Sequence, residues 1–171
     1  MECGDPGAEP CEEPTPDPDV VYGVDGEWPR VVLNEVMARN HSTLADGSGR
    51  WSDWVELKNL TGEDVDIGGW SLSDDPEEPD KHVLDDHTIP AGGHLVLWAD
   101  DTPALGPAHL RFSLASAGDL LGVYAPDGTT MDLLTFGAQA ADVSLARLPD
   151  GRGGWELTAS PSPGESNGES P

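Results

Sequence analysis

Residues 31–75 read VVLNEVMARNHSTLADGSGRWSDWVELKNLTGEDVDIGGWSLSDD, and this stretch decides the fold. Two short apolar runs, 31–33 and 54–57, flank a polar loop that is rich in Gly and Asp, and a third apolar run covers 67–72. Short apolar runs separated by turn residues are typical of β-strands. The stretch therefore predicts three strands with carboxylates gathered at their ends.

The rest of the chain continues this pattern. The breaks between apolar runs contain Gly, Pro or Asp, which favour turns, and the Pro residues fall outside the runs, as a sheet requires. No long run has the 3.6-residue period of a helix, so we expect at most a turn or two of helix. The pattern predicts an all-β sandwich or barrel with strands at 31–37, 54–59, 69–73, 81–83, 94–99, 120–124, 131–135, 144–148 and 155–157.

Two segments indicate how the strands are buried. Residues 55–58 alternate apolar with charged side chains, which predicts one buried and one solvated face. Residues 95–98 are apolar in both phases, which predicts a central strand with two buried faces. Trp70 and Trp98 are expected in the core, whereas Trp51, in the acidic loop, is the tryptophan most expected to be exposed.

The composition changes at both ends of this strand-rich region. Residues 1–29 alternate Pro with acidic residues and hold few apolar ones, which predicts a disordered arm or linker. Residues 164–171 are polar and rich in Gly and Ser, and they are expected to form a disordered tail. The predicted domain covers 30–163, a length that suits a single core.

The chain is strongly acidic. Its 171 residues include 33 Asp and Glu against 8 Lys and Arg, which gives a formal net charge of −25. Such a field repels nucleic acid and anionic lipid head groups and attracts cations. No run approaches the roughly 18 apolar residues that a transmembrane helix needs. The first residues, MECGD, lack the basic start and apolar middle of a signal peptide.

Both cysteines, Cys3 and Cys11, lie in the N-terminal arm. Cys3 is a candidate for the lipid-carrying residue of a bacterial surface lipoprotein, with the arm as a spacer. Alternatively, the two cysteines form a local disulfide in an oxidising compartment, or both are free thiols. Their spacing matches no zinc motif.

The carboxylates around the first loop raise the question of a metal ion. Antiparallel pairing of 31–37 with 54–59 would bring oxygen atoms from both strands and the loop to one end of the sandwich. Ca²⁺ takes roughly six to eight oxygen ligands, which such loops supply. The candidate ligands are Glu35, Asn40, Asp46, Asp53, Glu56, Asp74 and Asp75, with Trp51 as a candidate contact for an external ligand.

The same residues also have a purely structural explanation. The loop is not an EF-hand, because counting from Asp46 places Trp51 where that motif needs Gly and Leu57 where it needs Glu. Turn hydrogen bonds would account for Asp74, and simple solvation would account for Glu56. Ca²⁺ is therefore a candidate ion, and the sequence implies no other cofactor.

Signals of catalysis are weak. No histidine belongs to a nucleophile elbow or a metalloprotease motif, and a lone loop histidine is expected to be neutral to function. Loop carboxylates could serve a hydrolase, but with 33 acidic residues such pairs arise from composition alone. The chain is expected not to be an enzyme, with hydrolysis by loop carboxylates as a remote alternative. The histidines are His41, His82, His87, His94 and His109.

Taken together, these residues resemble the lamin tail domain family, in particular its exported bacterial branch. The resemblance covers about residues 31–164, and its motifs occur in the right order. The matching segments include 33–38 (LNEVMA), 53–57 (DWVEL), 69–75 (GWSLSDD), 89–93 (IPAGG), 96–100 (VLWAD), 112–114 (FSL), 135–137 (TFG), 149–151 (PDG) and 161–164 (PSPG).

The resemblance implies an immunoglobulin-like β-sandwich of about eight or nine strands that acts as an interaction or scaffolding module and is not itself an enzyme. In bacteria such domains are often carried by secreted or surface-attached proteins, and in animals they form the globular tail of nuclear lamins. This chain has no coiled-coil rod and no basic stretch, which argues against a lamina-like or DNA-binding role.

Two functional hypotheses result. In the first, a non-catalytic domain on or outside a bacterial cell, tethered through the arm and a lipid at Cys3, contacts a protein or cell-surface polymer. In the second, acidic loops bind an extracellular polysaccharide or protein in a Ca²⁺-dependent way. Both place the chain outside the cell or on its surface, as an outer-membrane lipoprotein in the anchored case.

Overall fold

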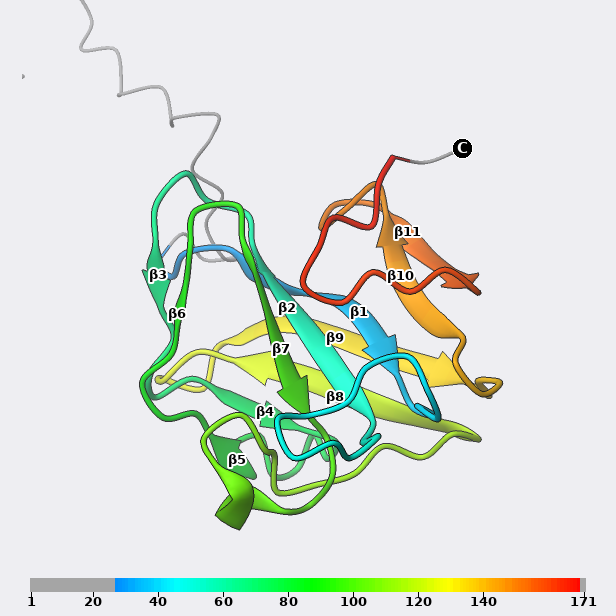
Figure 1. The fold of residues 1–171 in the computed structure, drawn as a ribbon. Helices are drawn as coiled ribbons and strands as arrows, with labels where there is room; N and C mark the ends of the chain where they lie inside the picture. The colour runs from blue at the N-terminus through cyan, green and yellow to red at the C-terminus, as the bar shows by residue number, and fades with distance from the viewer. Residues whose placement is uncertain (1–26, 170–171) are drawn as a thin grey trace, which may run out of the picture.

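The computed structural model describes residues 27–169, which contain eleven β-strands and one short 3₁₀ helix (Figure 1). The architecture is all-β, as the strand pattern predicts. The strands are β1 (Val31–Met37), β2 (Trp54–Asn59), β3 (Val65–Asp66), β4 (Ser71–Ser73), β5 (His82–Val83), β6 (Thr88–Ile89), β7 (His94–Trp98), β8 (Gly118–Tyr124), β9 (Thr130–Gly137), β10 (Ser144–Leu148) and β11 (Gly154–Thr158), and the helix is η1 (Pro103–Leu105).

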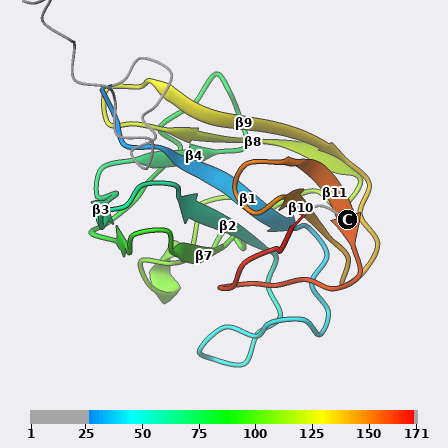
Figure 2. The same ribbon diagram turned by 90° about the horizontal axis from the view of Figure 1, so that it is seen from above.

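Two sheets face each other. The first has five strands in the order β11-β10-β1-β2-β7, and the second has four in the order β5-β4-β8-β9. Neighbouring strands pair antiparallel, and β3 and β6 form a small sheet of their own. Figure 2 shows β4, β8 and β9 in one layer and β1, β2 and β7 in the other. The fold is therefore an immunoglobulin-like β-sandwich.

The alternation predicted for β2 builds the core. Val55 and Leu57 are fully buried between the sheets, while the second sheet contributes Leu72 from β4 and Leu121 from β8. Trp70, immediately before β4, is buried among them, as expected. Each such side chain stabilises the folded state by roughly 1.5–3 kcal/mol relative to leaving it in water.

The strand positions predicted from the sequence are confirmed closely. β1, β2 and β10 have the predicted bounds, and the other predicted strands begin and end within one or two residues of the expected positions. The sequence does not predict β3 or β6, because a two-residue strand shows no period.

β7 differs from its prediction. It is an edge strand of the five-stranded sheet and pairs with one other strand, β2. Its Leu97 lies in the core, while Trp98 packs with Trp54 in a second apolar cluster. Leu44 and Ala108, which lie in loops, pack against that cluster. Loops therefore cover the second face of β7, although the strand itself lies at the edge of its sheet.

The two ends of the chain compare differently with their predictions. Residues 1–26 and 170–171 lie outside the described part, and with them Cys3, Cys11 and most of the predicted arm. The expected disordered tail from residue 164 onward instead makes defined hydrogen bonds as far as Gly168, in the red segment that crosses β10 and β1 in Figure 1. No helix within residues 27–169 has the length and apolar character needed to cross a membrane.

Replacing Leu57 by Ala should lower the free energy of unfolding by about 2–5 kcal/mol, because the change opens a cavity in the core. Urea unfolding followed by tryptophan fluorescence measures this loss. The matched control is Leu157→Ala, the same chemical change at a side chain that is 60% exposed. The control should change stability by less than about 0.5 kcal/mol. Equal losses in the two variants would contradict this assignment of the core.

Candidate functional site

Two glutamates are buried side by side on the face of the five-stranded sheet that points away from the core. Glu35 in β1 is paired with Glu56 in β2, and both are fully buried. A β-bulge between Leu33 and Glu35 shifts the register, and the buried Asn34 lies at this point. Buried carboxylates need hydrogen-bond donors or lose their charge. The surroundings of the carboxylate cluster (Asn34, Glu35 and Glu56) therefore decide its state.

The C-terminal segment, residues 160–168, supplies these donors. The main-chain N–H of Ser162 donates to both carboxylate oxygens of Glu35, at 3.2 and 3.1 Å. The N–H of Gly164 donates to Oε2 of Glu56 at 2.6 Å. Ser144 in β10 adds its hydroxyl to Glu35. The segment is thereby held on the outer face of the sheet by backbone amides that donate to side-chain carboxyl groups.

Asn167 fastens the far end of the C-terminal segment. Its side-chain amide donates to the carbonyl oxygens of Asn34 and Arg147 at 3.0 and 3.1 Å. Its Oδ1 accepts the Ser162 hydroxyl at 2.9 Å, and its main-chain N–H donates to Asp150 at 3.0 Å. One side chain thus ties the segment to both β1 and β10.

Asp150 carries a charge at the border of the carboxylate cluster. Its carboxylate accepts a hydrogen bond from Asn34 at 2.9 Å and forms a largely buried ion pair with Lys58 at 2.8 Å. Burial raises the pKa of Asp150, but the hydrogen bonds from Lys58, Asn167 and Asn34 outweigh it and lower the pKa to about 2. Nε2 of His94 lies 3.3 Å from the same carboxylate. Burial lowers the pKa of His94 most, and the positive charge of Lys58 lowers it further.

The two buried glutamates respond to burial in the opposite direction from Asp150. Burial raises the pKa of Glu56 to about 8, against the lowering effect of the hydrogen bonds from Gly164 and Asn34. Burial also raises the pKa of Glu35, although the Ser144 hydroxyl donates to it. Glu56 therefore holds its proton across a pH range in which an exposed glutamate has lost it.

The structure does not gather the seven predicted calcium ligands at one place. The two buried glutamates are bonded to the C-terminal segment, Asp53 accepts the N–H of Asn40 at 3.0 Å, and Asp74 pairs with Lys81 at 2.6 Å. Asp75 accepts an N–H within its own turn. Of the seven, Asp46 alone belongs to a group of three acidic or histidine side chains in residues 27–169 that lie close enough together to hold a metal ion. Calcium binding stays a prediction.

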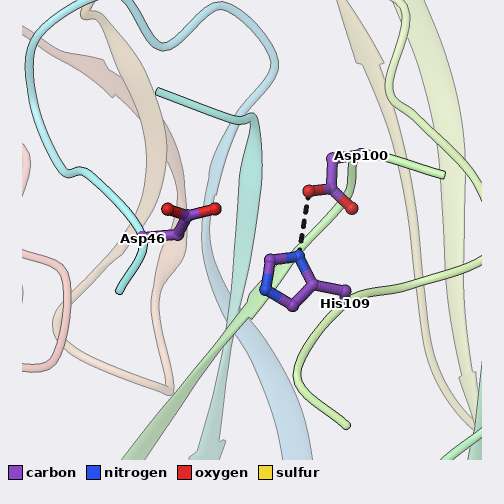
Figure 3. Close-up of side chains that lie close together, drawn as sticks. All are labelled: Asp46, Asp100 and His109. Atoms are coloured by element: carbon purple, nitrogen blue, oxygen red, sulfur yellow. Dashed lines mark hydrogen bonds and ion pairs between the residues drawn. The ribbon is translucent and has the colours of Figure 1, made fainter. Parts of the chain in front are cut away.

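That group consists of Asp46, Asp100 and His109 (Figure 3). One oxygen from each carboxylate and one imidazole nitrogen lie within 4.8 Å of one another. Nδ1 of His109 is 2.9 Å from Oδ2 of Asp100. We name these three residues the Asp–Asp–His cluster.

A tight turn fixes the orientation of Asp46. The N–H groups of Ser48 and Arg50 donate to its Oδ1 at 2.8 and 2.9 Å, and the Ser48 hydroxyl donates to the same oxygen. Gly49, with φ of 83°, closes the turn in a conformation that suits glycine. These hydrogen bonds lower the pKa of Asp46, and the one from the main-chain N–H of Arg50 has the largest effect. Its Oδ2 is buried and has no hydrogen-bond partner among the described residues.

β7 and the loop that follows it place the other two members. Asp100 lies just after β7, and His109 forms a parallel bridge with Trp98, on which its ring stacks with centroids 6.4 Å apart. Burial raises the pKa of Asp100, but hydrogen bonds from Thr102 and His109 outweigh it, so the pKa is lowered. A cavity of about 210 Å³ borders the cluster and is lined by Asp46, Gly47, Ser48, Leu105 and His109.

Sequence reasoning identified Asp46 as a ligand candidate but neither Asp100 nor His109. The pairing of Trp54 with Trp98 places the loop before β2 beside the segment after β7. Pairing the predicted strands 54–59 and 94–99 would therefore have indicated Asp100. No local motif marks His109, which reaches the site through the loop after η1.

Comparison with known protein families gives one match, which covers most of the strands described above. The lamin tail domain model matches residues 27–138, more than half of the chain. The chain belongs to the lamin tail domain family. Among curated proteins, none matches it. The matched region runs from just before β1 to just after β9 and holds both the carboxylate cluster and the Asp–Asp–His cluster, whereas β10, β11 and the C-terminal segment follow it.

The lamin tail domain fold is generally non-enzymatic. An Asp–His pair such as Asp100 and His109 supports nucleophilic catalysis when a hydroxyl or thiol lies within hydrogen-bond reach of the imidazole. Ser48 lines the adjacent cavity, but its hydroxyl donates to Asp46 at 2.8 Å.

Replacing Asn167 by Ala should lower the free energy of unfolding by about 1–3 kcal/mol, because three side-chain hydrogen bonds are lost. Amide hydrogen exchange in residues 161–168 should accelerate before exchange in β1 does. Glu165→Ala, at an exposed neighbour whose side chain makes no hydrogen bond to another of residues 27–169, is the control and should leave both quantities nearly unchanged. Unaltered exchange in the Asn167 variant would show that this residue does not fasten the segment.

Replacing Glu56 by Gln should reduce the dependence of stability on pH. The folded pKa of about 8 lies above the ordinary 4.5, so the folded state holds a proton that the unfolded state releases between these values. The contribution of Glu56 to the free energy of unfolding is fully present below about pH 4.5. It is lost as the pH rises through about 8, by at most about 1.4 kcal/mol per pH unit.

Urea unfolding at a series of pH values measures this slope. Glu56→Gln should make the slope shallower between about pH 5 and 8, leaving the part that comes from Glu35. The control is Glu156→Gln in β11, where the side chain is exposed, and it should keep the slope of the unaltered chain. An undiminished slope in the Glu56 variant would contradict the raised pKa of Glu56.

Proposed function

We propose that this lamin tail domain is a non-catalytic interaction module of the exported bacterial type, displayed on or outside the cell. Family membership together with an unpaired strand edge carries the proposal. β11 pairs with β10 on one side and with no other strand among the described residues. An unpaired edge can accept an extended segment of a partner as an additional strand.

β11 has the properties of a docking edge. Its Leu157 is the most exposed large apolar side chain in residues 27–169. The strand contains neither Pro nor Lys, the residues that commonly block edge-to-edge pairing. Trp155 anchors the strand, with the guanidinium of Arg147 located 4.5 Å from the centre of its ring. The partner that fits this edge is an extended protein segment with an apolar side chain opposite Leu157.

Display outside the cell is supported by the composition and by the arm. The net charge of −25 disfavours nucleic acid and anionic membrane surfaces as partners. The Pro-rich, acidic residues 1–29 suit a spacer, and Cys3 suits a lipid anchor at its start. In this proposal the lipid tethers the domain, and the arm holds β11 away from the membrane.

Replacing Leu157 by Lys in the full chain should reduce capture of the partner from envelope extracts about tenfold, because a charge opposes pairing at the strand edge. The matched control is Leu133→Lys, at an exposed leucine in the other sheet, and it should capture the partner as the unaltered chain does. Undiminished capture by the Leu157 variant, or equal losses in both, would contradict β11 as the contact edge.

The location is tested separately. Protease added to intact cells should cleave the tagged chain, and the mass of its N-terminal peptide should show a lipid on Cys3. A chain that is protected in intact cells, with Cys3 unmodified, would overturn display and tethering without bearing on the edge of β11.

A further inference from the structure

We infer that the Asp–Asp–His cluster is a binding site for a divalent transition-metal ion, with Zn²⁺ as the favoured ion. The inference goes beyond the proposed interaction function and does not depend on it. Carboxylate oxygen and imidazole nitrogen are common zinc ligands. One such atom from each of Asp46, Asp100 and His109 lies within 4.8 Å of the other two, in a chain whose net charge of −25 attracts cations.

The unpartnered oxygen of Asp46 is the observation that indicates a ligand. The residue is 7% exposed, and its Oδ1 takes three hydrogen bonds from the turn. Its Oδ2 is buried and accepts none from residues 27–169. Buried polar atoms are nearly always satisfied, and a cation supplies what a carboxylate oxygen lacks. Figure 3 shows one oxygen of Asp46 directed toward Asp100 and His109.

The other two members lie near the spacing that an ion requires. Nδ1 of His109 and Oδ2 of Asp100 are 2.9 Å apart, a hydrogen-bond distance that widens by about 0.5 Å when both atoms bind one ion. Zinc with bonds of about 2.0–2.2 Å in a tetrahedral site holds its ligands about 3.4 Å apart. Small side-chain rotations that move the ligand atoms by about 1 Å therefore complete the site. Ion binding through Nδ1 requires the neutral imidazole that carries its proton on Nε2.

The number and kind of ligands favour Zn²⁺ over Ca²⁺. Calcium takes roughly six to eight oxygen ligands, whereas zinc accepts three protein ligands that include nitrogen and leaves a fourth position open. The 210 Å³ cavity borders the cluster on the side of Asp46 and His109. Water, or an oxygen atom of a bound molecule, has room there to complete the coordination.

One cation already competes for the site. Nη2 of Arg50 lies 3.6 Å from Oδ2 of Asp100, and its side chain is 43% exposed. The Ser52 hydroxyl is 3.3 Å from the same oxygen. Because Arg50 can swing into solvent, metal binding displaces it. Removing the charge of Arg50 should therefore tighten metal binding, an effect that a purely structural role of the cluster does not predict.

Titration calorimetry with ZnCl₂ or CaCl₂ alone tests the inference. The protein is the full chain with Cys3→Ser and Cys11→Ser, so that thiols in the arm do not bind zinc. It should bind one Zn²⁺ with higher affinity than Ca²⁺. Asp46→Asn and His109→Gln should each weaken zinc binding about tenfold or more, and Arg50→Gln should strengthen it. Asp101→Asn and His41→Gln, at exposed positions, are the matched controls and should bind zinc normally.

Unaltered zinc affinity in the Asp46 or His109 variant, or binding of Ca²⁺ as tight as that of Zn²⁺, would overturn the inference. Asp46→Asn retains an oxygen that can accept the hydrogen bonds of the turn, so its fold should persist, and circular dichroism checks this. Should either variant unfold, nitrogen-15 spectra of the histidine rings in the parent chain decide the matter. Zn²⁺ should shift the ring nitrogens of His109, and an unshifted His109 would overturn the inference.

Discussion

The outer face of the five-stranded sheet depends on hydrogen bonds from backbone amides to two carboxyl groups that have no contact with water. Glu35 and Glu56 lie opposite each other in adjacent strands, a position in which two like charges would repel each other. Ser162 and Gly164 bring N–H groups to them from the end of the domain, and Asn34 bridges Glu56 and Asp150. These bonds allow the C-terminal segment to cover a sheet face that would otherwise be open to solvent.

The structure therefore buries residues on both sides of this sheet by two different means. Between the sheets, apolar side chains such as Val55 and Leu57 pack without polar partners. On the outer face, an apolar cluster around Trp98 adjoins β7, and the carboxylate cluster lies nearer β10. Packing stabilises the first interface, whereas directional hydrogen bonds fix the position of the covering segment on the second.

Much of the fold can be predicted because its signals are local. Alternation in residues 55–58 gives the inward and outward faces of β2 correctly, and turn residues give the breaks. The environment of Glu56 could not be predicted in this way. Its side chain points outward as the alternation indicates, yet it is buried because Gly164, 108 residues away, lies over it. Composition alone suggested disorder for that segment, since Asn167 and its hydrogen-bond partners form no local pattern.

The candidate metal ligands show the same division. Asp46 stands out because it lies in a polar, Gly-rich loop that ends at a predicted strand. Asp100 requires the strand pairing, and His109 requires the path of the loop beyond β7, which no periodicity encodes. Trp51, expected to be exposed, is half exposed, because exposure in a polar loop follows from local composition. Residues brought together by topology are thus the ones that sequence reasoning misses.

The order of the contacts along the C-terminal segment has a mechanical consequence. A pull on the chain beyond residue 169 loads the carbonyl of Gly168 first, then the bonds of Asn167, then the amide of Gly164, and then that of Ser162. These contacts bear the tension in turn, so the segment peels from the sheet stepwise, while strands sheared along their length share the load among many bonds. Water would reach Glu56 before Glu35, and both before the layer between the sheets opens.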